Sequence, residues 1–106
     1  MSDPIKLPKF TKDGAVEEIR RIAKEDSSKV IVLDHAKIRM MEREITSRQI
    51  YNVLKNGEPK CAPEWDTEQE KGWKCRLSRV TAGTAVTVVA KLVERDENVC
   101  LIVTVF

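Results

Sequence analysis

Residues 72–106, GWKCRLSRVTAGTAVTVVAKLVERDENVCLIVTVF, decide the fold of this chain. They contain three runs rich in β-branched and apolar residues, at 72–81, 84–94 and 98–106, and such runs are typical of β-strands. Ala82-Gly83 and the short segment before the last run are connections suited to antiparallel hairpins. The last run is almost continuously apolar, which favours a central strand covered on both faces.

The segments before these strands begin with helical spacing. Residues 11–26 carry apolar side chains on one face of a helix, and Thr11 or Asp13 can cap its start. Residues 29–34 then form a brief strand or a buried extended connection. After the last helix, we expect the strand at 60–65, KCAPEW, to lead into the three later strands.

Two further helices are expected between these strands. Asp34 is a plausible N-cap for a helix that runs through Arg43. The next helix begins near Thr46 or Ser47, and Gly57 supplies a left-handed terminator at its end. Helices followed by strands predict an α+β protein, with the helices packed on one face of a roughly four-stranded antiparallel sheet.

The composition sets the broad class. The chain has 106 residues, 42% of them hydrophobic and 34% charged, which indicates a single globular domain over 1–106. No apolar run approaches the ~18 residues of a membrane-spanning helix, and no signal peptide opens the sequence. We therefore expect a cytoplasmic protein without membrane contact.

Residue types that hold metals or cofactors are sparse. Cys61, Cys75 and Cys100 are an odd number of cysteines whose spacing fits neither a disulfide framework nor a zinc site, so we expect buried thiols. With one histidine and isolated glycines, the sequence predicts no metal site and no nucleotide cofactor.

Charge is segregated along the chain although the net charge is only +2. A short acidic stretch comes first, and a basic stretch without acids follows it over residues 71–93. The acids are Glu64, Asp66, Glu68 and Glu70, and the bases are Lys71, Lys74, Arg76, Arg79 and Lys91. Such a basic stretch is compatible with nucleic-acid binding, while a solvated sheet face is an equally good interpretation.

The basic strand has two distinct faces. Alternation places Lys74 and Arg76 on one face and Trp73 on the other. A strand face with lysine and arginine can follow a nucleic-acid backbone, and a tryptophan can stack on bases. Core packing is the alternative for the tryptophan.

His35, the only histidine of the chain, shares a helical stripe with Arg39 and Arg43. An imidazole beside two guanidiniums suits a phosphodiester, since histidine can transfer a proton near neutral pH and arginine can bind phosphate oxygens bidentately. Two structural alternatives stay open. Arg39 and Arg43 can pair with acids such as Glu42, or Asp34, His35 and Arg39 can form a cap network.

Residues 35–58, HAKIRMMEREITSRQIYNVLKNGE, contain a recognisable signature. It reads His-Ala-x-x-Arg-Met-x-x-Arg-x-Ile-Thr, followed by a helix and Asn-Gly. This resembles the small bacterial domains called domain of unknown function 4258 (DUF4258), with the likeness covering residues 29–106 and leaving residues 1–28 as a lead-in and an extra helix. The family is similar to the barnase–EndoU–colicin–RelE superfamily, which implies a RelE-like or barnase-like fold.

The resemblance implies a function as well. The implied function is that of a toxin-like, metal-independent endoribonuclease. In this enzyme His35 would be the general acid or base, and Arg39 and Arg43 would hold the phosphate. The sheet residues Lys74, Arg76 and Trp73 would bind RNA, and an antitoxin or immunity protein is the implied protein partner. A non-catalytic RNA-binding or protein-interaction module on the same scaffold is the alternative.

The chain departs from the family pattern at one position. Glu44 stands where the family usually has glycine, between Arg43 and Ile45. Glycine would end the first helix of the signature in a left-handed conformation, which glutamate disfavours. We therefore expect the turn after Arg43 to be continuous or differently bent.

Overall fold

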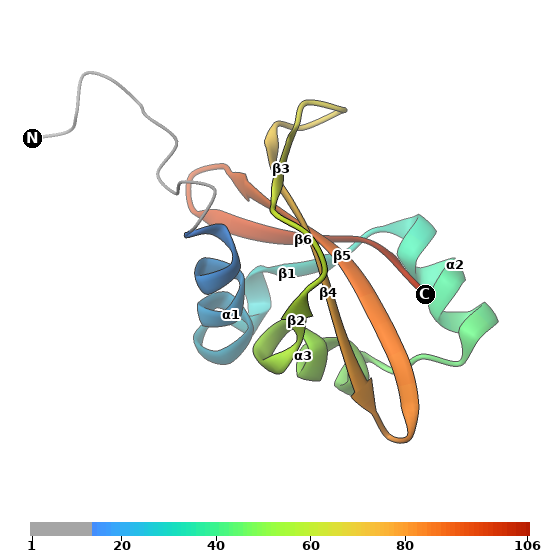
Figure 1. Cartoon of the computed structure of the whole chain (residues 1–106). Helices are drawn as coiled ribbons and strands as arrows, with labels where there is room; N and C mark the ends of the chain where they lie inside the picture. The colour runs from blue at the N-terminus through green and yellow to red at the C-terminus, as the bar shows by residue number, and fades with distance from the viewer. Residues whose placement is uncertain (1–13) are drawn as a thin grey trace, which may run out of the picture.

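The computed structural model describes residues 14–106, which form a six-stranded mixed sheet with helices over one of its faces (Figure 1). The strands follow the order β1-β6-β5-β4-β2, and β3 also pairs with β4. Their bounds are β1 Val30–Val32, β2 Glu58–Pro59, β3 Glu64–Asp66, β4 Gly72–Thr81, β5 Thr84–Glu94 and β6 Asn98–Val105. The α+β class and the three long strands are thereby confirmed, and β6 is a central strand.

The prediction of roughly four antiparallel strands is wrong in two respects. The single strand expected at 60–65 is absent as such: β2 ends at Pro59, before it, and β3 begins only at Glu64. The two strands pair with different parts of β4, and residues 61–63 leave the ladder between them. The brief strand β1 joins the sheet as well, and it pairs with β6 in the parallel direction. β1 and β6 can pair in parallel because most of the chain lies between them in the sequence, and a parallel pair needs such a long crossover connection.

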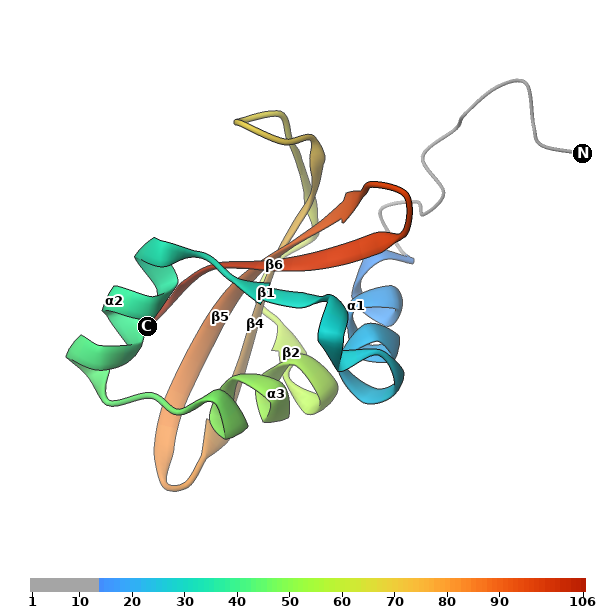
Figure 2. The same cartoon turned by 180° about the vertical axis from the view of Figure 1, so that it is seen from behind.

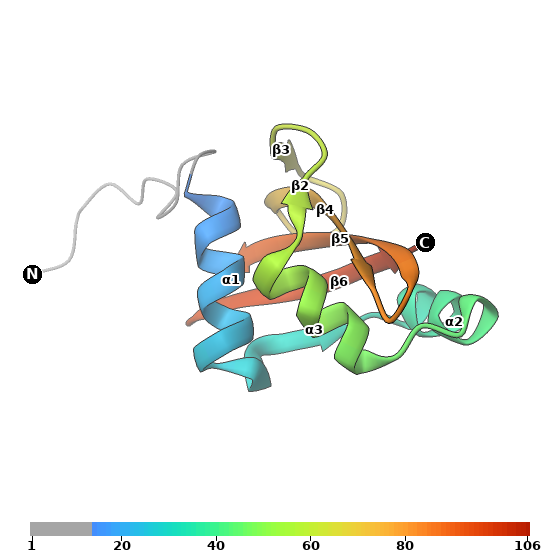
Figure 3. The ribbon, with the colours of Figure 1, turned by 60° about the horizontal axis from the view of Figure 1, so that its bottom comes forward.

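The long strands divide their side chains between two faces. Leu77, Val88 and Val105 are fully buried and belong to the main core, which β4, β5 and β6 form together with α1 (Ala15–Glu25) and α3 (Ser47–Asn56). Figure 3 shows these two helices side by side over the same face of the sheet. None of the helices within residues 14–106 is long and apolar enough to cross a membrane.

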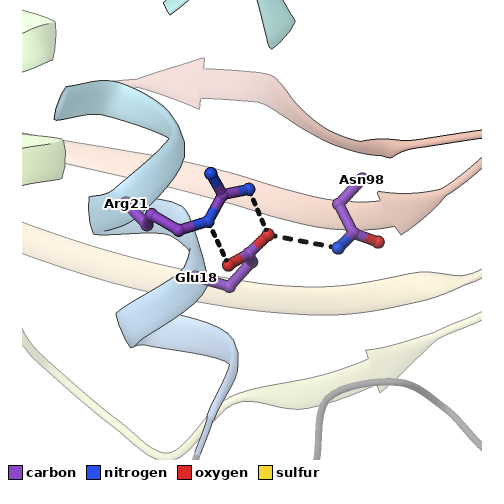
Figure 4. A network of polar contacts seen from close by, with 3 residues as sticks. All are labelled: Glu18, Arg21 and Asn98. Atoms are coloured by element: carbon purple, nitrogen blue, oxygen red, sulfur yellow. Dashed lines mark hydrogen bonds and ion pairs between the residues drawn. The ribbon is translucent and has the colours of Figure 1, made fainter. Parts of the chain in front are cut away.

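Helix α1 is attached to the start of β6 by a polar cluster (Figure 4). The guanidinium of Arg21 donates to both carboxylate oxygens of Glu18 at 2.8 and 2.7 Å, and the amide of Asn98 donates to the same carboxylate at 3.1 Å. Glu18 is only 7% exposed, so these bonds satisfy a carboxylate that burial would otherwise destabilise. Thr11 and Asp13, the predicted caps, lie outside the described residues, and α1 begins after Gly14 without a side-chain cap.

Helix α2 (Asp34–Arg43) lies at the edge of the sheet, in the place where β1 would continue (Figure 2). The short 3-10 turn η1 (Ser27–Lys29) leads into β1. Leu33 then connects β1 to α2. Asp34 is therefore the first helical residue, and Leu33 occupies the N-cap position without a side-chain hydrogen bond. The predicted cap at Asp34 is wrong.

Helix α3 begins as expected and ends differently. Thr46 is the N-cap, and its side chain exchanges hydrogen bonds with Gln49 in a capping box. Gly57 has a φ of −69°, which is not left-handed, so the predicted terminator is wrong. A Cβ at this residue would lie 2.5 Å from the carbonyl oxygen of Val53, so the glycine permits a close approach of the backbone.

Glu44 ends α2 in the left-handed conformation, with a φ of 55° and a ψ of 44°. The helix thus ends in the left-handed conformation that glycine would adopt, and the expectation of a continuous or differently bent turn is wrong. The next residue, Ile45, donates its N–H to the carbonyl oxygen of Met40 at 2.9 Å, which satisfies a carbonyl at the helix end. Glutamate occupies this conformation at a cost that glycine would not incur.

The cysteines are only partly as predicted. Cys75 and Cys100 are buried, and burial raises the pKa of each thiol to about 12. Cys61 is exposed, because residues 61–63 leave the sheet and carry it away from the core.

Replacement of Glu44 by glycine tests the left-handed helix end. We expect Glu44→Gly to raise the free energy of unfolding by about 1 kcal/mol, because glycine adopts this conformation without a Cβ clash. Urea unfolding followed by circular dichroism measures the change. Arg43→Gly is the matched control inside the last helical turn, with an expected loss of about 0.5–1 kcal/mol. A loss of stability in Glu44→Gly would contradict this explanation.

Candidate functional site

The sheet face that α1 and α3 leave uncovered is called the open face below. Its side chains alternate with the core residues of β4, β5 and β6, as the cross-strand pairs of Arg76 with Val89 and of Val89 with Thr104 indicate. The open face includes polar side chains and one valine, namely Lys74, Arg76, Ser78, Thr87, Val89, Lys91 and Thr104. Towards the other end of β5 and β6 it also carries Val93, Val99 and Leu101, which are buried in a second apolar cluster with Leu33. It therefore combines cations and hydroxyl groups at one end with apolar side chains at the other.

Two cations of the open face, Lys74 and Arg76, are outside the ion pairs of residues 14–106. Within the described part of the chain, neither Lys74 nor Arg76 forms an ion pair. The guanidinium of Arg76 lies 5.5 Å from the centroid of the Phe106 ring, a cation–π arrangement at the end of β6. Lys74 stands opposite Glu64 across the strands and its charge helps to lower the pKa of Asp66, but no carboxylate of the described residues holds either side chain in an ion pair. Both can therefore bind an anion from solution.

Helix α2 carries the predicted histidine stripe. His35 and Arg43 are exposed, and Arg39 is half-buried with its guanidinium 3.6 Å from the carboxylate of Glu42. Ala36 is fully buried, so the neighbouring stripe packs inward as expected. The pairing of Arg39 with Glu42, one of the alternatives predicted from the sequence, is thus present, although 3.6 Å is long for an ion pair.

The proposed cap network is not seen. No hydrogen bond or ion pair reaches the His35 imidazole from any of residues 14–106, and Asp34 makes no cap bond. The imidazole is consequently available to a ligand, and no neighbouring group fixes its orientation.

The end of β6 connects the helix stripe to the open face. Helix α2 packs against β6, and the carboxyl end of the chain lies beside α2 in Figures 1, 2 and 3. Phe106, at that end, contacts Arg76 of β4. The structure therefore brings α2 and Arg76 to the same end of β6. Trp73 does not share this surface, because its half-buried ring packs against the core on the helix-covered face.

A feature that the sequence did not predict is a buried cation under the acidic stretch. Residues 64–70, called the acidic arm, include β3 and lie against Lys91, whose side chain is only 5% exposed. The Lys91 ammonium is 3.2 Å from an Asp66 carboxylate oxygen and donates to the Glu68 carbonyl oxygen at 2.8 Å. In the folded chain, the acidic stretch therefore pairs with a lysine of the basic stretch.

A second ion pair attaches the acidic arm. The guanidinium of Arg95 donates to both carboxylate oxygens of Glu70 at 2.8 Å, in bidentate geometry. Between arm and sheet lies a cavity of about 360 Å³, lined by Lys91, Arg95, Asp66, Glu68, Gln69, Glu70, Leu33, Leu101 and Val103. Since Leu33 directly precedes α2, the cavity borders the helix that carries His35. The separation of acids from bases along the sequence was the signal that could have predicted these pairs.

These contacts shift the ionisation of the arm. The backbone N–H of Glu68 donates to Asp66 at 3.1 Å, and this bond, followed by that from Lys91, holds the pKa of Asp66 below its usual range. Arg95 likewise lowers the pKa of Glu70. Among residues 14–106, no cluster of three His, Cys, Asp or Glu side chains is arranged to hold a metal ion.

Acid titration tests the ion pairs of the arm. Because the pKa of Asp66 is lower in the folded chain, its contribution to stability is present above the ordinary carboxyl pKa and is lost as the pH falls below about 4. We expect wild type to lose more stability than Asp66→Asn between about pH 7 and pH 3 in urea unfolding. Glu64→Gln, an exposed carboxylate of the same strand, is the control and should follow wild type. Equal losses in wild type and Asp66→Asn would refute the pairing.

Comparison with known proteins identifies the family of the chain. No curated protein matches the chain, and no solved structure matches it either. One family model matches residues 32–106, which include β1's last residue, α2, α3 and all later strands, and its description is Domain of unknown function (DUF4258). The match covers most of the chain and leaves α1 outside. The chain therefore belongs to the family described as Domain of unknown function (DUF4258).

Proposed function

We propose that this protein is a toxin-like, metal-independent endoribonuclease on a RelE-like scaffold of the barnase–EndoU–colicin–RelE superfamily. The observation that carries the proposal is that α2, which bears His35, and Arg76 of β4 both lie near the end of β6. There, the partner-free imidazole of His35 lies on a helix that borders the strand end, and Arg76 contacts the terminal Phe106 ring. An imidazole and guanidiniums around one surface suit the cleavage of a phosphodiester.

The chemistry follows from these groups. The 2′-hydroxyl of RNA attacks the adjacent phosphorus, the bond to the leaving 5′-oxygen breaks, and a 2′,3′-cyclic phosphate forms. His35 takes the proton of the hydroxyl or gives one to the leaving oxygen. Arg39 and Arg43 stabilise the charge that develops on the phosphate oxygens. Lys74 and Arg76 hold the neighbouring backbone from the open face.

A non-catalytic RNA-binding or protein-interaction module is the second candidate. Two observations favour it: Arg39 faces Glu42 at 3.6 Å, and no group within residues 14–106 orients the His35 imidazole. Catalytic histidines are usually held by a further hydrogen bond. On this alternative the open face binds RNA through its cations, and no cleavage follows.

An antitoxin or immunity protein is the partner that accompanies the first proposal. Ile38 and Met41 of α2 are 54% and 82% exposed, an apolar pair one helical turn apart. A protein that covered this pair would also approach His35 and block the proposed site. The proposed partner would therefore inhibit the enzyme by covering its active site.

Cleavage of RNA in the presence of a chelator tests the catalytic proposal. Purified wild type should cut single-stranded RNA in EDTA and leave 2′,3′-cyclic phosphate ends, which mass spectrometry of the fragments detects. We expect His35→Ala to reduce the cleavage rate by about 10²–10⁴, the usual contribution of a general acid or base. Lys37→Ala, an exposed cation on the same helix, is the matched control and should keep most of the rate.

The two candidates give different results in this assay. Full cleavage by His35→Ala would remove the histidine from the mechanism. Salt-sensitive RNA binding without any cleavage by wild type would favour the binding module instead.

A further inference from the structure

Few contacts hold the acidic arm in place. Strand β3 pairs with β4 through only three residue pairs, and the rest of the arm is attached by the contacts to Lys91 and Arg95. Gln69, at the tip, has a left-handed φ of 60°, a conformation that glutamine adopts at a cost. An anion that competed for the two cations would therefore loosen the arm without disturbing the core.

Lys91 and Arg95, the two cations under the arm, lie near Lys74 and Arg76, the cations of the open face that form no ion pair among residues 14–106. Lys91 is the cross-strand partner of Lys74, and Arg76 lies two residues further along β4. Two residues of a strand span about 7 Å, a spacing comparable with that of successive phosphates along a single strand of RNA. Arg95 follows directly after β5 and lines the same cavity as Lys91. Lys74, Arg76 and Lys91 thus lie on one face of the sheet, and Arg95 reaches the cavity that Lys91 lines.

We propose that Arg95 and Lys91 are further phosphate ligands of the open face, and that the Glu70 and Asp66 carboxylates mask them as internal substitutes for phosphate. This inference rests on the proposed function, because the ligand is the phosphodiester backbone of RNA. Carboxylate and phosphate oxygens accept the same bidentate bonds from a guanidinium, so one can replace the other. RNA and the acidic arm then compete, and the arm lowers the affinity of the resting protein for RNA.

Removal of one masking carboxylate tests the competition. Glu70 and Arg95 are both partly exposed, so Glu70→Gln should keep the fold, which a thermal melt verifies. We expect it to tighten the Kd for a fluorescent single-stranded RNA dodecamer about twofold to fivefold in fluorescence anisotropy. The slope of log K against log salt should steepen by about 0.7, the value for one more phosphate contact on single-stranded RNA.

Glu97→Gln is the matched control. It removes the same charge and an ion pair of the same length, that of Glu97 with Lys29 at 2.8 Å, without touching the arm. We expect it to leave the Kd close to that of wild type. The double variant Glu70→Gln/Arg95→Gln should lose the gain, because the unmasked ligand is then absent.

The outcomes separate this inference from the proposed function. If wild type binds RNA and Glu70→Gln binds no more tightly than Glu97→Gln, masking is overturned while RNA binding stands. A gain that persists in the double variant would also overturn it, since Arg95 would not be the ligand. If neither wild type nor Glu70→Gln binds RNA, both the inference and the proposed function are overturned.

Discussion

The ladder between β4 and β5 joins ten residue pairs in one unbroken register, and this register assigns each side chain of the two strands to a face of the sheet. Leu77 and Val88 face the helices and are fully buried in the core. Arg76 faces away from them. A shift by one residue would exchange the two faces and bury the cations, so the register fixes core and candidate site together.

The alternation that sets this register is visible in the sequence, which is why β4 and β5 could be predicted to the residue. Longer-range features could not be predicted in this way. The parallel pairing of β1 depends on Cys100–Ile102 at the other end of the chain, and no local pattern specifies a partner so distant. Gly57 illustrates a related limit. Its identity suggested a left-handed helix end, whereas the close approach of the Val53 carbonyl explains the glycine.

The candidate site was predictable to a similar degree. His35 is conspicuous as the only histidine, and helical spacing placed it on one stripe with Arg39. Spacing within one helix does not tell which strand the helix borders, so the relation to Arg76 and Phe106 required the fold. Lys91 was predicted only as one member of a basic stretch. Its burial against Asp66 depends on the hairpin that folds the acidic arm back over β5.

On the proposal made above, the open face together with α2 is the surface that binds RNA. Titration of ¹⁵N-labelled protein with a short single-stranded RNA tests it most directly, because each backbone amide reports binding near its own position. We expect shifts in the amide signals of α2, of residues 74–78 and of residues 104–106, while the signals of α1 and of the exposed side of α3 stay unchanged. Shifts confined to α1 and α3, on the opposite side of the sheet, would contradict it.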